Sequence, residues 1–111
     1  MAYDEELAGR IRELVAGEPG LEEKKMFGGL GFMVGGNMAV AASGQGGLLV
    51  RVDPAESDAL VASTPPAYPM EMRGRKMAGW LRLDSEHVAG AELDAWLERG
   101  VAYARSLTLK P

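Results

Sequence analysis

The chain has 111 residues, of which 47% are hydrophobic and 25% charged, and its formal net charge at pH 7 is −4. This length and composition predict a single folded domain over residues 1–111. Because cysteine is absent, disulfides, thiolate metal sites and cysteine nucleophiles are excluded. The acidic balance gives no general attraction to nucleic acid, whose binding depends on the neutralisation of phosphates.

The N-terminal residues carry acidic side chains, whereas a signal peptide needs a basic patch followed by an apolar run. No stretch of the sequence approaches the roughly 20 apolar residues that span a membrane. We therefore expect a cytoplasmic protein with no membrane partner.

The first predicted element is an amphipathic helix over roughly residues 3–16. Its apolar stripe recurs at intervals of four, four and three residues: Tyr3, Leu7, Ile11 and Leu14. Gly17 and Pro19 follow the stripe and predict the end of the helix.

A glycine-rich region comes next and predicts an antiparallel meander of three strands. These strands are expected at residues 25–34, 38–42 and 48–52. The first is interrupted at Gly28-Gly29, where a β-bulge would account for the break. Gly35-Gly36 predicts a two-residue hairpin turn, because both residues readily adopt positive φ.

The second half of the chain predicts a short helix followed by two strands. The helix is expected to begin at Asp53, whose side chain can cap it, and to end by Ser63. Three prolines at 64–69 predict a loop. The strands are expected at 70–73 and 78–83. Alternation in the second places Trp80 and Arg82 on one face and Leu81 and Leu83 on the other.

The final helix is expected over about 91–106. Its predicted buried stripe consists of five residues: Leu93, Trp96, Leu97, Val101 and Ala104. Short turns join consecutive strands, which predicts antiparallel pairing. We expect an α+β fold of two layers, α-β-β-β-α-β-β-α, with a five-stranded antiparallel sheet and helices packed on it.

No motif in the chain matches a known catalytic or cofactor-binding pattern. Gly29-Leu30-Gly31 resembles the start of a dinucleotide fingerprint, but the third glycine comes one position late and no helix follows. His87 is the only histidine, and the chain has no second histidine or cysteine to complete a zinc site. We therefore expect a protein that is not an enzyme and has no metal or cofactor.

The best candidate for a functional site is a basic run in the second predicted hairpin, Arg73, Arg75 and Lys76. With Lys24, Lys25, Arg51 and Arg82 it would form one positive face. Together with Lys25 and Trp80 it is the candidate interaction patch for an anion, a nucleic acid or an acidic partner. The alternative interpretation is a charged loop that keeps the sheet soluble and discourages pairing at its edge.

Methionine is unusually frequent, with 7 residues in the chain. Six of them fall in or beside predicted strands: Met26, Met33, Met38, Met70, Met72 and Met77. Methionine fills irregular cores and also lines adaptable binding surfaces. The strand predicted at 38–42 is apolar on both faces, which predicts a second covered face, contacted by a partner or by a second copy of the chain.

One motif resembles the signature of the TfoX/Sxy N-terminal domain family. It comprises Met26, Phe27, Gly28, Gly29, Gly31 and Phe32, and it is followed by Gly79-Trp80. The resemblance spans nearly the whole chain and implies an α-β-β-β-α-β-β-α domain in which the motif glycines are structural. Full-length members regulate natural competence together with a cyclic-AMP-responsive transcription factor. They carry a second, C-terminal domain, which would begin where this chain ends.

The resemblance and the missing catalytic motifs favour a non-enzymatic regulatory or protein-interaction domain. Its contacts would be partner proteins of unknown identity, or a second copy in a homodimer. Two alternatives stay open. One is a nucleic-acid-binding accessory protein that uses the basic hairpin loop. The other is a domain that binds a small ligand in a pocket between sheet and helices.

Overall fold

The computed structural model describes residues 3–26, 28–64, 66–88 and 90–107. Its helices are α1 (Glu5–Leu14), α2 (Ser57–Ser63) and α3 (Ala91–Ser106), with a short 3-10 helix, η1 (Ser85–His87). Its strands are β1 (Leu21–Met26), β2 (Gly29–Val34), β3 (Asn37–Ala42), β4 (Leu48–Arg51), β5 (Tyr68–Met72) and β6 (Arg75–Leu83). The described strands form one antiparallel sheet in the order β1-β2-β3-β4-β6-β5.

The α+β class is confirmed, but the described sheet has six strands and the expected number of five was wrong. The segment expected as a single strand at 25–34 is divided between β1 and β2, which pair with Met26 opposite Gly29. Gly28 therefore lies in a tight turn, with φ 77°, and not in a β-bulge. Phe27 lies outside the described residues.

Sequence periodicity does not predict β1, because the side chains of this strand do not alternate between apolar and polar. Its four central residues, Glu22, Glu23, Lys24 and Lys25, are all exposed. Such a charged strand suits the outer edge of a sheet, where it discourages pairing with another chain. A real register irregularity occurs further on, between Phe32 and Met33 in β2.

The other hairpins follow the expected chemistry. Gly35 and Gly36, with φ 62° and 83°, form the predicted turn between β2 and β3. Arg73 and Gly74, with φ 55° and 78°, connect β5 and β6. Pro69 lies inside β5, where a loop was expected, and is tolerated because β5 is the outermost strand.

The second helix begins later than predicted. The carboxylate of Asp53 accepts a hydrogen bond from the Ala55 N–H at 2.9 Å, so Asp53 shapes a turn before the helix and does not cap α2. The Ser57 hydroxyl donates to the Pro54 carbonyl at 3.1 Å and accepts from the Gly79 N–H at 3.2 Å. These two bonds attach the start of α2 to β6.

The predicted final helix is confirmed, and all five residues of its stripe are buried. In α1, Leu7 and Ile11 are buried as expected, but Leu14 is 51% exposed and Val15 occupies the inner position instead. The helix is shorter at both ends than the expected range of 3–16, because Asp4 caps its start and Val15 ends it.

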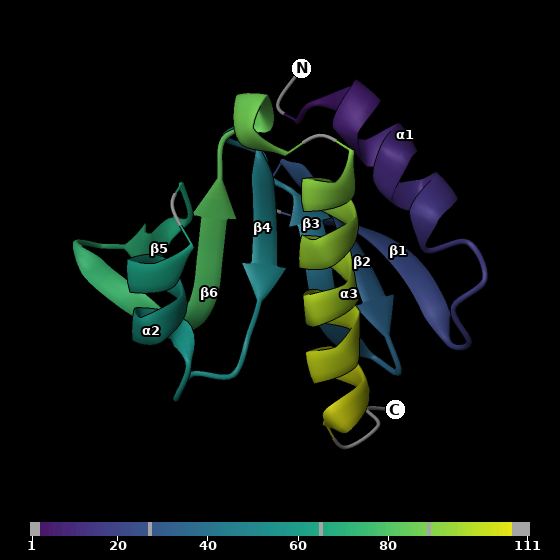
Figure 1. The fold of residues 1–111 in the computed structure, drawn as a ribbon. Coiled ribbons are helices and arrows are strands. Elements are labelled where there is room, and N and C mark those ends of the chain that lie inside the picture. Colours follow the sequence, from purple (N-terminus) through teal and green to yellow (C-terminus); the bar gives the residue numbers. More distant parts are fainter. Residues whose placement is uncertain (1–2, 27, 65, 89, 108–111) are drawn as a thin grey trace.

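The core lies between the helices and one face of the sheet (Figure 1). α3 crosses the middle strands, α1 lies beside it, and α2 packs on β5 and β6. Alternation along the strands directs Leu48, Val50, Leu81 and Leu83 into this core, where all four are buried. No helix within the described residues has the length and apolar character needed to cross a membrane.

A methionine-lined trough on the uncovered face of the sheet

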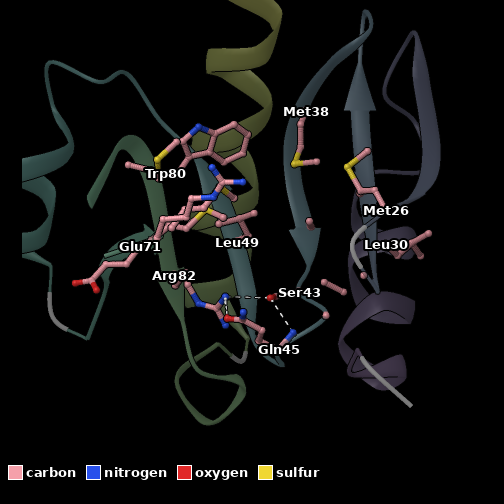
Figure 2. Close-up of a pocket in the computed structure, with 18 residues that line it drawn as sticks. Met26, Leu30, Met38, Ser43, Gln45, Leu49, Glu71, Trp80 and Arg82 are labelled. Carbon is pink, nitrogen blue, oxygen red and sulfur yellow. Dashed lines mark hydrogen bonds between the residues drawn. The ribbon is translucent and has the colours of Figure 1, made fainter. Parts of the chain in front are cut away.

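A cavity of about 550 Å³ opens on the sheet face opposite the core (Figure 2). We call it the methionine trough, because five of the seven methionines line it: Met26, Met38, Met70, Met72 and Met77. Leu49 and Trp80 add to its apolar lining. In Figure 2 the α3 ribbon lies behind the strands, so the trough and the helices occupy opposite sides of the sheet.

Strand periodicity and small side chains together create the hollow. In β4, Leu49 points away from Leu48 and Val50 and therefore faces the trough. The register places Gly31, Ala41, Leu49 and Arg82 in one row across four strands. Ala41 keeps the floor of the trough low, and Gly31 leaves room for longer side chains from the neighbouring strands.

Gly31, from the motif that resembles the family signature, has a specific place in this floor. A Cβ atom added to Gly31 would lie 3.0 Å from the Met38 Cε and 3.7 Å from the Met26 Cε. The two methionine side chains therefore reach over the glycine. Figure 2 labels Met26 and Met38 on neighbouring parts of the sheet. The glycine makes room for the methionines that line the trough.

Arg82 supplies a positive charge to the trough. Its guanidinium donates to the Ser43 hydroxyl at 3.1 Å, the Gln45 side-chain oxygen at 2.9 Å and the Gly46 carbonyl at 3.0 Å. All three acceptors are neutral, and Arg82 forms no ion pair with any described carboxylate. The bonds hold the β3–β4 loop against β6 and leave the charge uncompensated.

Two other arginines lie near the trough. Arg73 lines it from the β5–β6 turn, where its φ of 55° is uncommon for a residue other than glycine. The guanidinium carbon of Arg51 lies 5.2 Å from the ring centre of Trp80 and 5.8 Å from that of Tyr103. Arg51 thus joins one wall residue of the trough to α3 by cation–π contacts.

The structure brings together only part of the patch suggested by the sequence. Arg73 and Trp80 line the trough, whereas Arg75 and Lys76 are exposed at the start of β6 and do not line it. Lys25 lies in β1, at the opposite edge of the sheet from the basic hairpin.

Sequence reasoning missed Ser43 and Gln45, and it placed Arg82 only in a broad positive face with the basic hairpin. Alternation predicted that Trp80 and Arg82 share a face, but no local signal indicated that this face is hollow. The sequence also suggested a pocket between sheet and helices, whereas the trough lies on the other side of the sheet.

Near η1, Asp84, Glu86 and His87 place their potential ligand atoms within 4.8 Å of one another. Asp84 also accepts a hydrogen bond from the Tyr68 hydroxyl at 2.8 Å. Asp84 and Glu86 are exposed, and such acidic groups are common on protein surfaces without a metal ion.

The sequence pattern of the TfoX N-terminal domain matches residues 13–104. The chain belongs to the TfoX N-terminal domain family. The matched range contains all six described strands, and it also contains every residue that lines the trough. No curated protein and no solved structure gives a significant match.

Proposed function

We propose that this TfoX N-terminal domain is a non-enzymatic regulatory domain that binds a partner protein in the methionine trough. The observation that carries the proposal is an apolar hollow of about 550 Å³ on a sheet face without a covering helix in the described chain. Contiguous exposed apolar surface on a small protein marks an interaction site. Flexible methionine side chains suit such a surface, because they adapt to the shape of a partner.

The polar groups of the trough support binding in preference to catalysis. Among the described lining residues, the charged ones are Arg73, Arg82 and Glu71, and none is a histidine or a cysteine. The Ser43 hydroxyl contacts Arg82 and the Gln45 N–H, and no hydrogen bond joins it to a base among the described residues that could activate it as a nucleophile. General acid–base chemistry needs a positioned proton donor and acceptor, which this lining does not offer.

An affinity pull-down from host lysate tests the proposal, with a matched pair of variants. Met72→Glu places a charge at the trough, and Leu14→Glu makes the same change on α1; both side chains are already about half exposed, at 45% and 51%. We expect the parent domain and Leu14→Glu to recover the same protein, and Met72→Glu to lose it. Equal recovery by all three proteins would contradict the proposal.

A nuclease-treated lysate separates this function from the second candidate. Arg73, Arg75 and Lys76 at the β5–β6 hairpin favour nucleic acid as the alternative ligand. Recovery that persists after nuclease treatment supports direct protein contact. Recovery that disappears after treatment, and that falls steeply with salt, would assign the binding to nucleic acid.

A further inference from the structure

We propose that the methionine trough binds an amphipathic helix whose apolar face is flanked by acidic side chains. This inference rests on the proposed function, because it names the chemistry of the partner segment that the trough would hold. It is carried by the backbone pairing of the floor, the width of the trough and the charge of its lining.

The floor of the trough favours a helix over an extended peptide. β3, β4 and β6 each pair with a neighbouring strand on both sides. Their backbone groups are therefore engaged within the sheet, and an extended segment lying across them would leave its own N–H and C=O groups unsatisfied. A helix meets its backbone hydrogen bonds internally and presents only side chains to the floor.

The width of the trough matches this occupant. Its floor spans from β2 to β6, which are separated by three strand spacings. At roughly 4.8 Å per spacing, this gives about 14 Å. A helix with its side chains is roughly 10–12 Å in diameter, so the backbone span of the floor accommodates one helix lying on the methionine side chains. Methionine-rich grooves bind helices through apolar side chains spaced three and four residues apart.

The charges of the lining favour acidic residues in the helix. Arg82 has five N–H donors, uses three in the bonds to Ser43, Gln45 and Gly46, and keeps its charge without an ion pair among the described residues. Arg73 adds a second positive charge at the β5–β6 turn.

Glu71, the one acidic residue that lines the trough, does little to offset these cations. In Figure 2 its carboxylate points away from the hollow. In the sheet it lies opposite Lys76, whose charge is of opposite sign. The trough is thus cationic although the whole chain has a net charge of −4.

The conformation of Arg73 agrees with a role for its charge. Asparagine followed by glycine is the favoured pair for a two-residue turn in which both φ angles are positive. Arginine occupies the first position, with φ 55°, although its side chain is less suited to this region. Replacing it with asparagine is therefore expected to stabilise the turn while removing the charge.

Two synthetic peptides test the inference with the full chain. Each has about 18 residues, or roughly five helical turns, with one leucine stripe. Glutamates flank the stripe in one peptide, and lysines flank it in the other. Binding is followed by NMR chemical-shift mapping and by Trp80 fluorescence in a Trp96→Phe background. We expect the glutamate peptide to bind at least about tenfold more tightly at low salt, with shifts confined to the trough.

Three variants locate the charge preference. Arg73→Asn and Arg82→Gln should each lower the affinity for the glutamate peptide about three- to tenfold. The affinity for the lysine peptide should stay the same or rise. Arg99→Gln removes an arginine on α3, where it stacks on Trp96, and should change neither affinity. Because Arg73→Asn should raise the melting temperature, weaker binding by this variant would not reflect unfolding.

The outcomes distinguish failure of this inference from failure of the proposed function. Equal affinity for the two peptides, or shifts on the helical face, would overturn the acidic-helix inference. Loss of the recovered protein with Met72→Glu in the pull-down would still support a protein partner.

Two other results would assign the trough to another occupant. A dimer in sedimentation analysis that dissociates in the Met72→Glu variant would assign the trough to a second copy of the chain. Binding of decanoate without binding of either peptide would assign it to a small amphiphile. Either result would overturn the inference.

Discussion

Gly29 occupies the narrowest point between the first hairpin of the sheet and the β3–β4 loop. A Cβ atom at this position would lie 2.5 Å from the Ala42 carbonyl oxygen and 2.8 Å from the Gly44 nitrogen. Both neighbours are backbone atoms, which cannot move aside as a flexible side chain can. The φ angle of Gly29 is not in the left-handed region, so close approach, and not unusual φ, is the reason for glycine here.

We expect Gly29→Val to destabilise the domain by at least about 1–3 kcal/mol, the usual cost of forcing extra atoms into a packed site. Urea denaturation measures the change. Gly9→Ala is the control: a Cβ there has nothing within 4 Å, and alanine is favoured in a helix by about 1 kcal/mol, so this variant should be more stable than the parent. A Gly29→Val protein with the parent midpoint would contradict the close approach.

Asp4 caps α1 by accepting a hydrogen bond from the Leu7 N–H at 3.0 Å. This bond, with a further one from the Ser85 hydroxyl, lowers the pKa of the Asp4 carboxyl below its ordinary value of 3.8. The lowered pKa means that the folded state favours the ionised carboxylate. Its stabilising contribution is therefore complete above the ordinary value and is lost as the pH falls through the lowered pKa.

Asp4→Ala should cost about 1 kcal/mol at neutral pH, the usual loss for an N-cap residue. The difference from the parent should shrink as the pH falls below about 3.8, because the carboxyl becomes protonated first in the unfolded parent and, at lower pH, in the folded parent. Urea denaturation at a series of pH values measures both effects. A difference that stays constant down to pH 2 would show that the ionised carboxylate is not the stabilising species.

At the scale of secondary-structure elements, α3 is the main support of the sheet. Its predicted anchor, Trp96, is confirmed as a core residue with 6% exposure. The helix comes closest to β3 at Gly100, where a Cβ atom would lie 2.6 Å from the Ala39 carbonyl oxygen and 2.8 Å from the Val40 Cγ1. A glycine inside a helix is thus retained for packing.

Gly100→Ala should therefore destabilise the domain by about 1–3 kcal/mol, although alanine alone would favour the helix by about 1 kcal/mol. Thermal denaturation of Gly100→Ala and of Gly9→Ala gives two melting temperatures. Their comparison separates a tightly packed helical glycine from one with open space around it. Melting temperatures raised equally in both variants would mean that α3 does not contact β3 at this point.

At the scale of the whole molecule, the proposed function depends on the difference between the two faces of the sheet. The described helices bury one face in the core, and the trough occupies the other (Figures 1 and 2). In β4, for example, the core residue Val50 alternates with the trough residue Leu49. The pull-down and the peptide titrations test whether a partner helix covers this second face.

Local chemistry determined much of the fold from the sequence alone. The stripe of α3, the Gly35-Gly36 turn and the alternation of Leu81 and Leu83 with Trp80 and Arg82 follow from periodicity and backbone preference, which act over a few residues. The same reasoning indicated that the 38–42 strand has a second apolar face. It missed β1, because a charged edge strand lacks alternation and its break at Gly28 resembled a bulge.

The tertiary structure decided where the candidate site lies. Strand order places β6 between β4 and β5, which brings Arg82 opposite Leu49 and next to the Ser43–Gly46 loop, 36–39 residues earlier in the chain. It also separates Lys25 from the basic hairpin by the width of the sheet. Local sequence patterns determined which residues share a face of a strand. Pairing between distant segments depends on how all the elements pack together, so only the assembled sheet made that face a trough.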